Sequence, residues 1–489
     1  MMNTKNRIKS ANPYMPLWEH VPDGEPRVFE YNGEKRVYVY GSHDTQRIYP
    51  CGMDYVVWSA SVDDLTNWTY HGVCYESPNG NPLFAPDVVQ KGDTFYLYAA
   101  ENSNLRITVS KSKNPAGPFT DTVLTELGHD ASGRVIGGDV GILVDDDGSV
   151  YAYWGFGKAC CAQLNDDMAT IKEGTLHENF IGHCRTDWTE KDEFENPDDG
   201  FYEAASPRKI NGKYVFVYSK FCSAPLPAYG LNEWTSMFLS YHYSDHPLTG
   251  YKRGGDISYN CGEVVSLPDG SRMSTYEHGN NHGGLAEIDG QWYVFYHRHT
   301  GLNCNSTARQ AMLEPIDVAM DPDGNVFIGR ITYEDGIPVA QQPVEMTSQG
   351  PHTNGLDAFS IISAAYTCHI SGGTQKTYVS TVWDEDALDE VAVKDITNGT
   401  VLGYRYLQFG TEASAKTLTA SICAYSSLTV RVRVDSYQGE IIAEASMKAE
   451  ETEVTAALTK PLSGKHAVYF EFASDAEGVI AAFKEFTFD

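Results

Sequence analysis

Three acidic residues stand at matching positions of a pattern that repeats along the first half of the chain. Asp23, Asp139 and Glu203 each precede an aromatic, Val-rich run by 11 to 14 residues, and no basic residue stands beside them. Two carboxyl groups that flank a glycosidic bond can cleave it, one by protonating the leaving oxygen and the other by activating water. The residue types and their spacing therefore predict glycoside hydrolysis, provided that the fold brings the acids together.

The three acids differ in their predicted roles. An inverting enzyme holds its acid and its base about 6.5–9.5 Å apart, which leaves room for the attacking water. A second buried carboxylate raises the pKa of the acid and so keeps it protonated. Glu203, which has the longer side chain and is followed by two Ala residues, is the predicted acid. Asp23 is the predicted base, and Asp139 is predicted to keep Glu203 protonated and oriented.

Four further residues are candidates for binding a sugar. His282 occupies the matching position of a fifth repeat, and Arg309 follows the aromatic run of that repeat. Phe84 and Trp154 could stack on a pyranose or furanose ring, as aromatic side chains do. Each residue also has a structural interpretation, as a hydrogen-bonded core histidine, a surface ion pair or an aromatic ring packed in the core. No metal-ligand spacing is present, since none of the ten Cys forms a C-x-x-C pair.

The elements that must position these residues are short strands. Five aromatic runs recur every 55 to 80 residues, behind turn signals such as Asn211-Gly212 and Asp289-Gly290. A long-period repeat of strand–turn–strand units is typical of β-propeller blades. If each blade places its polar residue on the innermost strand, those residues meet at one end of the central channel. The aromatic runs are 37–40, 95–98, 150–153, 214–218 and 292–296.

The chain divides into two predicted domains, and the predicted fold class is all-β. Residues 1–345 are expected to form a five-bladed β-propeller that ends in the linker 341–345. From about residue 350 Trp becomes scarce, and short strands with period-two alternation appear. Short strands spaced by roughly eight to twelve residues are typical of a sandwich, so residues 346–489 are expected to form a β-sandwich of the jelly-roll type.

The composition limits the partners that the protein can bind. The formal net charge is −30, from 36 basic and 66 acidic residues, which disfavours nucleic acids and anionic membranes and suits a neutral oligosaccharide. No apolar leader or membrane-spanning run is visible, and the Cys residues are expected to be free thiols. We therefore expect a cytoplasmic protein, and the sequence leaves its oligomeric state open.

These motifs resemble those of glycoside hydrolase family 43, whose members are five-bladed propellers that act on arabinose- and xylose-containing glycans. The resemblance runs from about residue 12 to residue 343. It implies catalytic roles for the three acids and a place in the site for the histidine and the arginine. The matching positions are the base Asp23, the pKa-modulating Asp139, the general acid Glu203, the channel histidine His282 and the late-propeller arginine Arg309.

The sequence departs from the family pattern in two places. Gly follows Asp23 where the family has Pro, and Glu25-Pro26 offers a second alignment in which Glu25 is the base. Regular strand alternation would place residues 23 and 25 on one face, so both could enter the pocket. The blade-two Trp of the family is Phe84 here.

The C-terminal segment resembles carbohydrate-binding module family 6. Few exposed aromatic residues are expected in it, so a supporting role for this domain is the alternative to glycan binding. The reaction is expected to need no cofactor, and a Ca²⁺ ion in the propeller channel or in the sandwich is compatible with the pattern.

The expected function is that of an exo-acting, inverting glycosidase. It would release terminal α-L-arabinofuranosyl or β-D-xylosyl residues from arabinoxylan- or xylan-derived oligosaccharides. Two alternatives are a glycosidase of the same fold that acts on another sugar, such as β-galactose, and a non-catalytic glycan-binding propeller.

Overall fold

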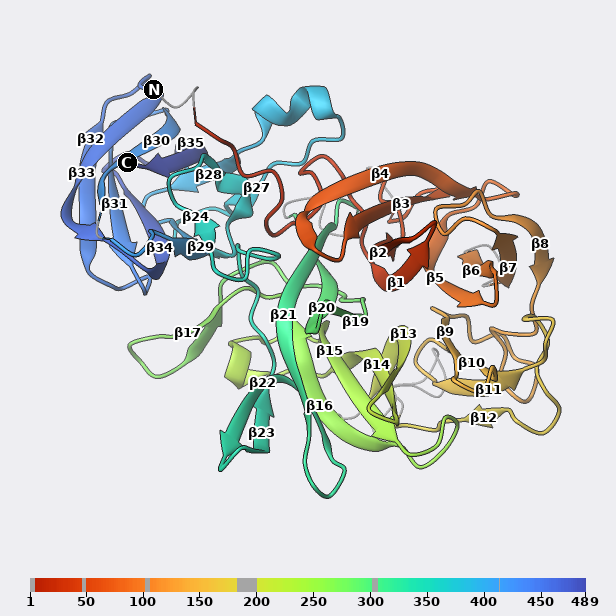
Figure 1. Cartoon of the computed structure of the whole chain (residues 1–489). Helices are drawn as coiled ribbons and strands as arrows, with labels where there is room; N and C mark the ends of the chain where they lie inside the picture. Colours follow the sequence, from red (N-terminus) through yellow and green to blue (C-terminus); the bar gives the residue numbers. More distant parts are fainter. Residues whose placement is uncertain (1–4, 46–49, 102–105, 183–199, 301–306, 413) are drawn as a thin grey trace.

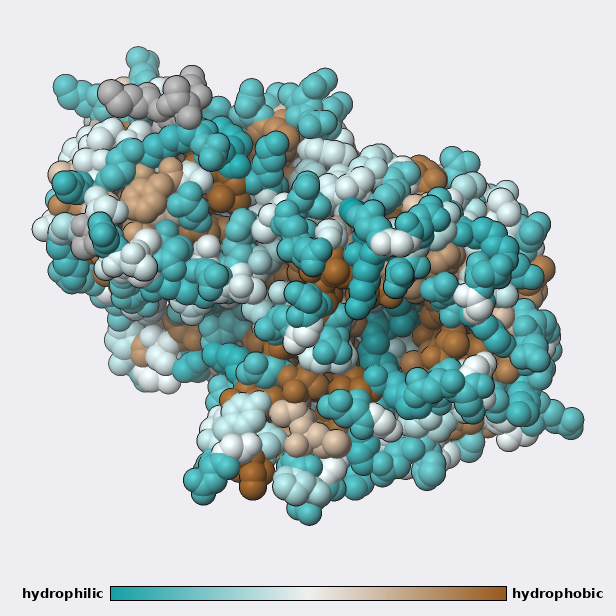
Figure 2. Space-filling model, in the orientation of Figure 1, coloured by the Kyte–Doolittle hydropathy of each residue, from teal (hydrophilic) through white to brown (hydrophobic). Residues whose placement is uncertain are grey.

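Antiparallel strands make up nearly all of the regular structure of this protein (Figure 1). The computed structural model describes residues 5–45, 50–101, 106–182, 200–300, 307–412 and 414–489. Among these residues, no helix is both long and apolar enough to span a membrane. Hydrophilic side chains cover most of the face shown in Figure 2, which agrees with the large negative net charge. The predicted all-β fold class, a propeller followed by a sandwich, is confirmed.

Four blades of the propeller are four-stranded sheets whose strands follow one another in chain order. Blade 1 comprises β1 (Glu25–Tyr31), β2 (Glu34–Tyr40), β3 (Asp54–Ser61) and β4 (Asp64–Glu76). Blade 2 comprises β5 (Leu83–Lys91), β6 (Thr94–Glu101), β7 (Arg106–Ser112) and β8 (Thr120–Leu124). Blade 3 comprises β9 (Gly141–Val144), β10 (Val150–Trp154), β11 (Cys160–Leu164) and β12 (His177–Glu178). Blade 4 comprises β13 (Phe201–Ile210), β14 (Lys213–Cys222), β15 (Thr235–Ser244) and β16 (Lys252–Tyr259).

The fifth blade is a sheet of five strands, and the last two of these strands form a hairpin at its outer edge. Its innermost strand β19 contacts β1 of blade 1, and β1, β5, β9 and β13 contact one another in sequence. Figure 1 shows these innermost strands around the centre of the propeller. The strands of the fifth blade are β19 (Leu285–Ile288), β20 (Gln291–Arg298), β21 (Gln310–Met320), β22 (Val326–Glu334) and β23 (Ile337–Gln342). Two smaller elements precede them in the chain, a separate hairpin of β17 (Val264–Ser266) and β18 (Arg272–Ser274) and the 3₁₀ helix η3 (Pro227–Tyr229).

The aromatic runs form strands that are buried on both faces, as β2 illustrates. Val37 and Val39 pack into a core that blade 1 shares with blade 5. Tyr38 and Tyr40 point to the opposite face and pack into a core shared with blade 2. Alternate side chains of a strand point to opposite faces of its sheet, so a strand between two blades must be apolar or aromatic at every position. This is why the runs show little alternation between polar and apolar residues.

The C-terminal part is a sandwich of two six-stranded sheets whose facing side chains form one large core. One sheet has the order β24-β29-β34-β31-β32, with β26 also paired to β29, and the other has the order β27-β28-β35-β30-β33, with β25 paired to β35. The elements are β24 (Leu356–Asp357), β25 (Ile362–Ser363), η4 (Ala364–Tyr366), β26 (His369–Ser371), β27 (Tyr378–Val379), η5 (Glu385–Glu390), β28 (Val393–Thr397), β29 (Val401–Gln408), β30 (Ala415–Ala424), β31 (Leu428–Val434), β32 (Ile441–Met447), β33 (Glu453–Leu462), β34 (Lys465–Ala473) and β35 (Val479–Phe488).

The segment before blade 1 packs on the sandwich, close to the C-terminus (Figure 1). The amide of Ile8 donates to the carbonyl of Ile361 at 2.9 Å, and Ala11 and Leu17 are part of the sandwich core. The division of the chain at residues 345 and 346 stays a prediction. The packing of residues 8–17 means that the first domain cannot be excised at that point without exposing part of this apolar contact.

Buried polar contacts hold the two domains together. Arg298 of β20 has no exposed surface, and its guanidinium donates to the carbonyls of Ala365 and Thr367 at 2.8 and 3.0 Å. Glu263, before β17, pairs with His369 at 3.0 Å and accepts a hydrogen bond from the Tyr469 hydroxyl at 2.9 Å. Among the described residues of the sandwich, Tyr425 is the exposed large aromatic side chain, at 59%. Glycan binding by this domain therefore stays a prediction.

Candidate active site

Irregular backbone at the start of three inner strands aims side chains into the channel at two levels. Glu203 and Ser206 both point inward although they are three residues apart, and the register of β13 shifts on either side of Glu203. β5 shows the same shift between Phe84 and Asp87. A regular strand would send residues of odd spacing to opposite faces, whereas a bulge realigns them. The first residue of each pair lines a pocket, and the second joins a polar layer beneath it.

Asp23 reaches the pocket by a different local device. Its backbone has φ of 59°, in the left-handed region, and β1 begins only at Glu25. Asp is one of the residues that tolerate this conformation. The expectation that Asp23 and Glu25 share a face of one regular strand is therefore wrong, because the chain turns between them and sends their side chains to different levels of the channel.

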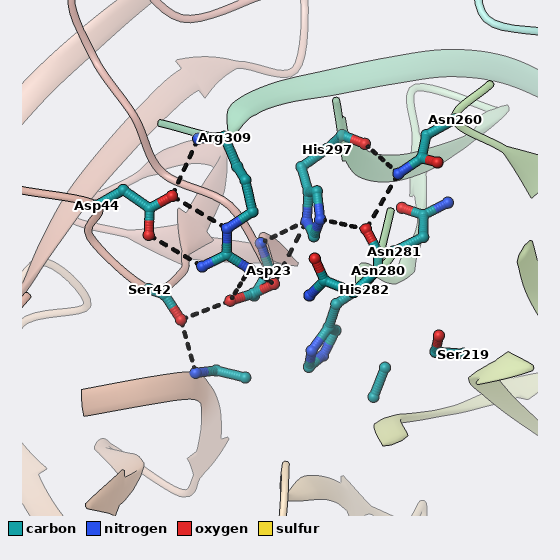
Figure 3. A network of polar contacts seen from close by, with 12 residues as sticks. Asp23, Ser42, Asp44, Ser219, Asn260, Asn280, Asn281, His282, His297 and Arg309 are labelled. Atoms are coloured by element: carbon teal, nitrogen blue, oxygen red, sulfur yellow. Dashed lines mark hydrogen bonds and ion pairs between the residues drawn. The ribbon is translucent and has the colours of Figure 1, made fainter. Parts of the chain in front are cut away.

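An arginine clamps Asp23 to a second, fully buried carboxylate (Figure 3). Arg309 donates to Asp44 through its backbone amide, Nε and Nη2, at 2.9–3.0 Å. Its Nη1 donates to Asp23 at 3.1 Å, and the Ser42 hydroxyl donates to the other oxygen of Asp23 at 2.6 Å. Donors of this kind bind the ionised form of a carboxyl group. Asp23 is thus held in place as a hydrogen-bond acceptor, as a general base must be.

His297 supports Asp23 as a neutral ring. Its Nε2 lies 2.7 Å from the carbonyl oxygen of Asn280 and must donate, while Nδ1 accepts the backbone amide of Asp23 at 3.2 Å. Burial and the nearby Arg309 hold the pKa of His297 well below its usual value. The 3.3 Å approach of Nδ1 to an oxygen of Asp23 is therefore no ion pair. Because the ring is uncharged, Arg309 is the cationic group that contacts Asp23.

Asp139, Glu203 and His282 line the same pocket and interact with one another. Asp139 accepts the backbone amide of Ala204 at 2.9 Å, and Ala204 has φ of 70° at the bulge of β13. Nδ1 of His282 lies 3.5 Å from the same carboxylate oxygen. Burial alone would lower the pKa of His282, but Asp139, Asp23 and Glu203 raise it to about 9. His282 is therefore a cation at neutral pH.

Glu203 is the carboxyl group that stays protonated. Burial, together with the carboxylates of Asp139 and Asp23, raises its pKa, whereas His282 and Arg309 lower it, and the net result is a pKa of about 8. An acid whose pKa lies near the working pH can both hold a proton and give it up. The pocket thus combines a proton donor with a carboxylate acceptor, the two groups that cleavage of a glycosidic bond requires.

The pocket between these groups has a volume of about 440 Å³. Asp23, Asp139, Glu203, His282 and Arg309, all predicted from the sequence as site residues, line it together. Phe84 lines it as well and offers an aromatic wall. Trp154 does not, which corrects its prediction as a sugar-stacking residue. Its ring has no exposed surface, because β10 packs it into the core between blades 2 and 3, where its Nε1 donates to the carbonyl of His129.

Several residues of the site were not among the sequence-based candidates. Ser42 and His297 contact Asp23, Asp44 binds the arginine that contacts Asp23, and Asn280 and Phe156 line the pocket. Ser42 and Asp44 stand directly after the first aromatic run, and His297 directly after the fifth. Polar residues at the ends of aromatic strands were therefore a usable signal, but one that also marks ordinary turns.

A layer of paired charges forms the floor of the pocket. Glu25 lies 2.6 Å from Arg208 and 3.1 Å from Arg27, and it accepts the Ser206 hydroxyl at 2.9 Å. Arg27 makes two further contacts with Asp87, at 3.0 and 2.7 Å. Burial raises the pKa of Glu25, and the two arginines more than reverse the effect, so that the net shift is downward. Glu25 is therefore a partner of two guanidinium groups and lies outside the pocket that Asp23 lines.

The floor requires a glycine directly before β19, the innermost strand of the fifth blade. A Cβ added to Gly284 would lie 2.6 Å from both Glu25 Oε2 and Ser206 Oγ and 2.9 Å from Arg208 Nη2. We expect Gly284→Ala to lower the free energy of unfolding by about 3 kcal/mol, since the buried ion pairs must move apart. Chemical denaturation measures this loss.

Gly33→Ala is the matched control. Gly33 lies in the β1–β2 turn with φ of 80°, and no atom lies within 4 Å of an added Cβ. The control carries only the cost of its backbone conformation, about 1 kcal/mol. A Gly284→Ala protein as stable as the control would show that the floor tolerates expansion.

A propeller whose channel holds carboxyl groups from three blades, one of them protonated near neutral pH, defines a glycoside hydrolase site. The family comparison agrees with this class. The family model for glycosyl hydrolases family 43 matches residues 25–326, and the chain belongs to this family.

The chain is similar to known proteins over nearly its whole length. The chain is 30% identical to a xylosidase/arabinosidase of Thermoclostridium stercorarium, over 98% of this chain and 99% of that protein. It is 24% identical to an arabinoxylan arabinofuranohydrolase of Paenibacillus polymyxa, over 95% of this chain and 72% of the relative. The crystal structure of a family 43 arabinoxylan arabinofuranohydrolase from Bacillus subtilis aligns with 99% of this chain and 98% of its own, at 21% identity and a TM-score of 0.50. The likeness of fold thus extends through the C-terminal domain.

Proposed function

We propose that the protein is an inverting exo-glycosidase that releases terminal α-L-arabinofuranosyl or β-D-xylosyl residues from arabinoxylan- or xylan-derived oligosaccharides. The observation that carries the mechanism is a carboxyl group with a pKa of about 8 in the same pocket as a clamped carboxylate. The substrate class is supported by the names of the relatives, which act as xylosidases, arabinosidases or arabinoxylan arabinofuranohydrolases.

The reaction uses the two carboxyl groups in one displacement. Asp23 takes a proton from a water molecule, whose oxygen attacks the anomeric carbon from the side opposite the leaving group. The bond between the anomeric carbon and the glycosidic oxygen breaks as Glu203 transfers its proton to that oxygen. The products are the free sugar, with inverted configuration, and the shortened oligosaccharide. Asp23 then loses its proton to solvent and Glu203 regains one, which restores the starting state.

The neighbouring charges tune the acid. Asp139 and Asp23 disfavour a negative charge on Glu203 before the reaction, whereas His282 and Arg309 stabilise the charge that appears when the proton leaves. Exo action on a terminal sugar is part of this proposal.

A Ca²⁺ ion in the channel or in the sandwich, which the sequence pattern allowed, stays a prediction. The floor carboxylates Glu25 and Asp87 face the guanidinium groups of Arg27 and Arg208 and are engaged in ion pairs. Among the described residues, no group of three or more His, Cys, Asp or Glu side chains is arranged to hold a metal.

A panel of aryl glycosides tests the proposal. The panel contains α-L-arabinofuranosides, β-D-xylosides and β-D-galactosides, and proton NMR follows the anomer that appears first. We expect release of arabinose or xylose with inversion. Release of galactose alone would show that the enzyme acts on another sugar. If the retained anomer appeared first, a single displacement by water would be excluded. If no member of the panel were hydrolysed, the protein would be a glycan-binding propeller without catalytic activity.

The pH dependence of kcat/KM tests the role of Glu203 directly. Protonated Glu203 is the active form, so activity is complete below its pKa and is lost as the pH rises through about 8. Above that pH we expect kcat/KM to fall by about tenfold per pH unit. Initial rates between pH 5 and 10 measure the profile. If kcat/KM already fell as the pH rose through 5, Glu203 could not be the acid. If the fall of kcat/KM at alkaline pH persisted in Glu203→Gln, it would reflect deprotonation of His282, whose pKa is about 9.

A further inference from the structure

Four aromatic side chains form a continuous row on the pocket side of blades 3 and 4. Ring centroids are 4.9 Å apart for Phe156 and Tyr202, 5.6 Å for Tyr202 and Phe221, and 5.3 Å for Phe221 and Trp234. The Phe221 and Trp234 rings are stacked at an interplanar angle of 10°, and Tyr202 also lies 6.4 Å from Trp234. We call these four residues the aromatic row.

The row begins inside the pocket and ends at the surface. Phe156 lines the pocket, and Tyr202 directly precedes the acid Glu203 on β13. Trp234, just before β15, is 56% exposed and is the exposed Trp among the described residues. A buried role in packing would cover this ring, as it covers Trp154. The row instead exposes its outermost and largest member.

The outer end of the row belongs to the rim of the same site. Thr235, next to Trp234, lies 3.2 Å from Nδ1 of His278 through its hydroxyl. The carbonyl of Ser236 accepts the amide of Asn281 at 3.1 Å, and the neighbours of Asn281 in the chain, Asn280 and His282, both line the pocket. The start of β15 is therefore fixed to the segment that carries the channel histidine.

The position of the acid indicates what occupies the row. Glu203 gives its proton to the glycosidic oxygen, and the departing sugar chain is bonded to that oxygen, so the chain must leave the pocket beside Glu203 and Tyr202. A neutral xylopyranose ring has flat apolar faces, which stack on aromatic side chains. We propose, on the basis of the proposed function, that the aromatic row lines the path of the leaving xylo-oligosaccharide and that Trp234, supported from behind by the buried ring of Phe221, stacks on a xylose residue beyond the first. The row thereby selects oligosaccharides over short glycosides.

Replacement of Trp234 by Ala tests the proposal by comparing two substrates. One carries the preferred terminal sugar on a xylotriosyl chain, and the other is the methyl glycoside of that sugar, whose aglycone is too small to reach Trp234. We expect Trp234→Ala to lower kcat/KM about tenfold on the oligosaccharide and to leave the methyl glycoside within about twofold. An equal loss on both substrates, or no loss on the oligosaccharide, would overturn the proposal.

Two variants serve as controls. Tyr333→Ala removes another exposed aromatic ring, 49% exposed on β22, and should leave both substrates unchanged. Trp234→Phe keeps a smaller ring on Phe221 and should lose about threefold on the oligosaccharide alone. If the Ala variant does not fold, Trp234→Phe provides the test. The ratio of kcat/KM on the oligosaccharide to kcat/KM on the methyl glycoside should then fall, and an unchanged ratio in a folded Phe variant would overturn the proposal.

Equilibrium binding separates this proposal from the proposed function. Calorimetry with unsubstituted xylotetraose, in the Glu203→Gln background that prevents turnover, should show a Kd about tenfold higher when Trp234 is replaced by Ala. If the aryl glycoside panel shows no turnover but this tenfold difference appears, the binding row stands and the catalytic assignment fails. If turnover occurs and Kd is the same with Trp and Ala, the row does not bind the chain.

Discussion

Replacement of Glu203 by Gln is expected to lower kcat/KM on xylo-oligosaccharides by about 10³-fold, since a positioned general acid contributes about 10²–10⁴. Gln fills the same space but has no proton to give to the leaving oxygen. The loss should be much smaller on aryl glycosides with acidic phenols, which leave as anions without protonation. A plot of log kcat/KM against the pKa of the leaving phenol should therefore become steep in the variant.

The stability of this variant checks that it is folded. Folding raises the pKa of Glu203, so its contribution to stability is fully present below its ordinary pKa of about 4.5 and is lost progressively as the pH rises to about 8. The melting temperatures of Glu203→Gln and of the native protein should therefore be similar near pH 4, and the variant should gain in relative stability as the pH rises to about 8. Near-native turnover on oligosaccharides, or a loss independent of the leaving group, would remove Glu203 from its role as acid.

Replacement of Asp23 by Asn is expected to lower kcat/KM by about 10³-fold on every substrate, whatever the leaving group. The base acts on the water and not on the leaving oxygen, so a better leaving group cannot compensate for its loss. Ser42 can still donate to the carbonyl oxygen of the substituted side chain, and Arg309 remains bound to Asp44. The same panel of phenols that shows a steep dependence for Glu203→Gln should show a native-like slope for Asp23→Asn.

Two control variants distinguish the base from the other acids. Asp146→Asn changes a carboxylate that is 88% exposed, and it should leave activity within about twofold. Glu25→Gln should reduce stability, because it leaves Arg208 and Arg27 without their shared partner in the floor. The folded fraction of Glu25→Gln should keep its activity. If Glu25→Gln abolished turnover in a folded protein while Asp23→Asn did not, Glu25 would be the base.

The two layers of the channel explain why neighbouring acids have such different roles. In the upper layer, carboxyl groups outnumber cations around Glu203, so that one of them keeps its proton. In the lower layer, Arg27 and Arg208 balance Glu25 and Asp87, and all four groups are positioned by ion pairs. β13 contributes to both layers, since Glu203 lines the pocket and Ser206 donates to Glu25 in the floor.

The repeat of aromatic runs was sufficient to predict the propeller. Strands such as β2 and β20 must be apolar at consecutive positions because neighbouring blades cover both faces, and this requirement is visible in the sequence itself. The change of composition after residue 350 likewise indicated a second all-β unit. The packing of residues 8–17 on that unit could not be predicted, since it depends on where the chain ends meet in space.

The sequence by itself determined which blades carry the acids, because Asp23, Asp139 and Glu203 occupy equivalent places in a repeat and closure of the propeller must bring such places together. Only the tertiary structure places Asp23 in the pocket and Glu25 in the floor, although they are two residues apart. This placement depends on a positive φ at Asp23 and on arginines from two blades that surround Glu25. The tertiary structure also determines that Phe84 faces the pocket and that Trp154 faces the core. The direction of a side chain at an irregular strand end follows from long-range packing and not from the local sequence.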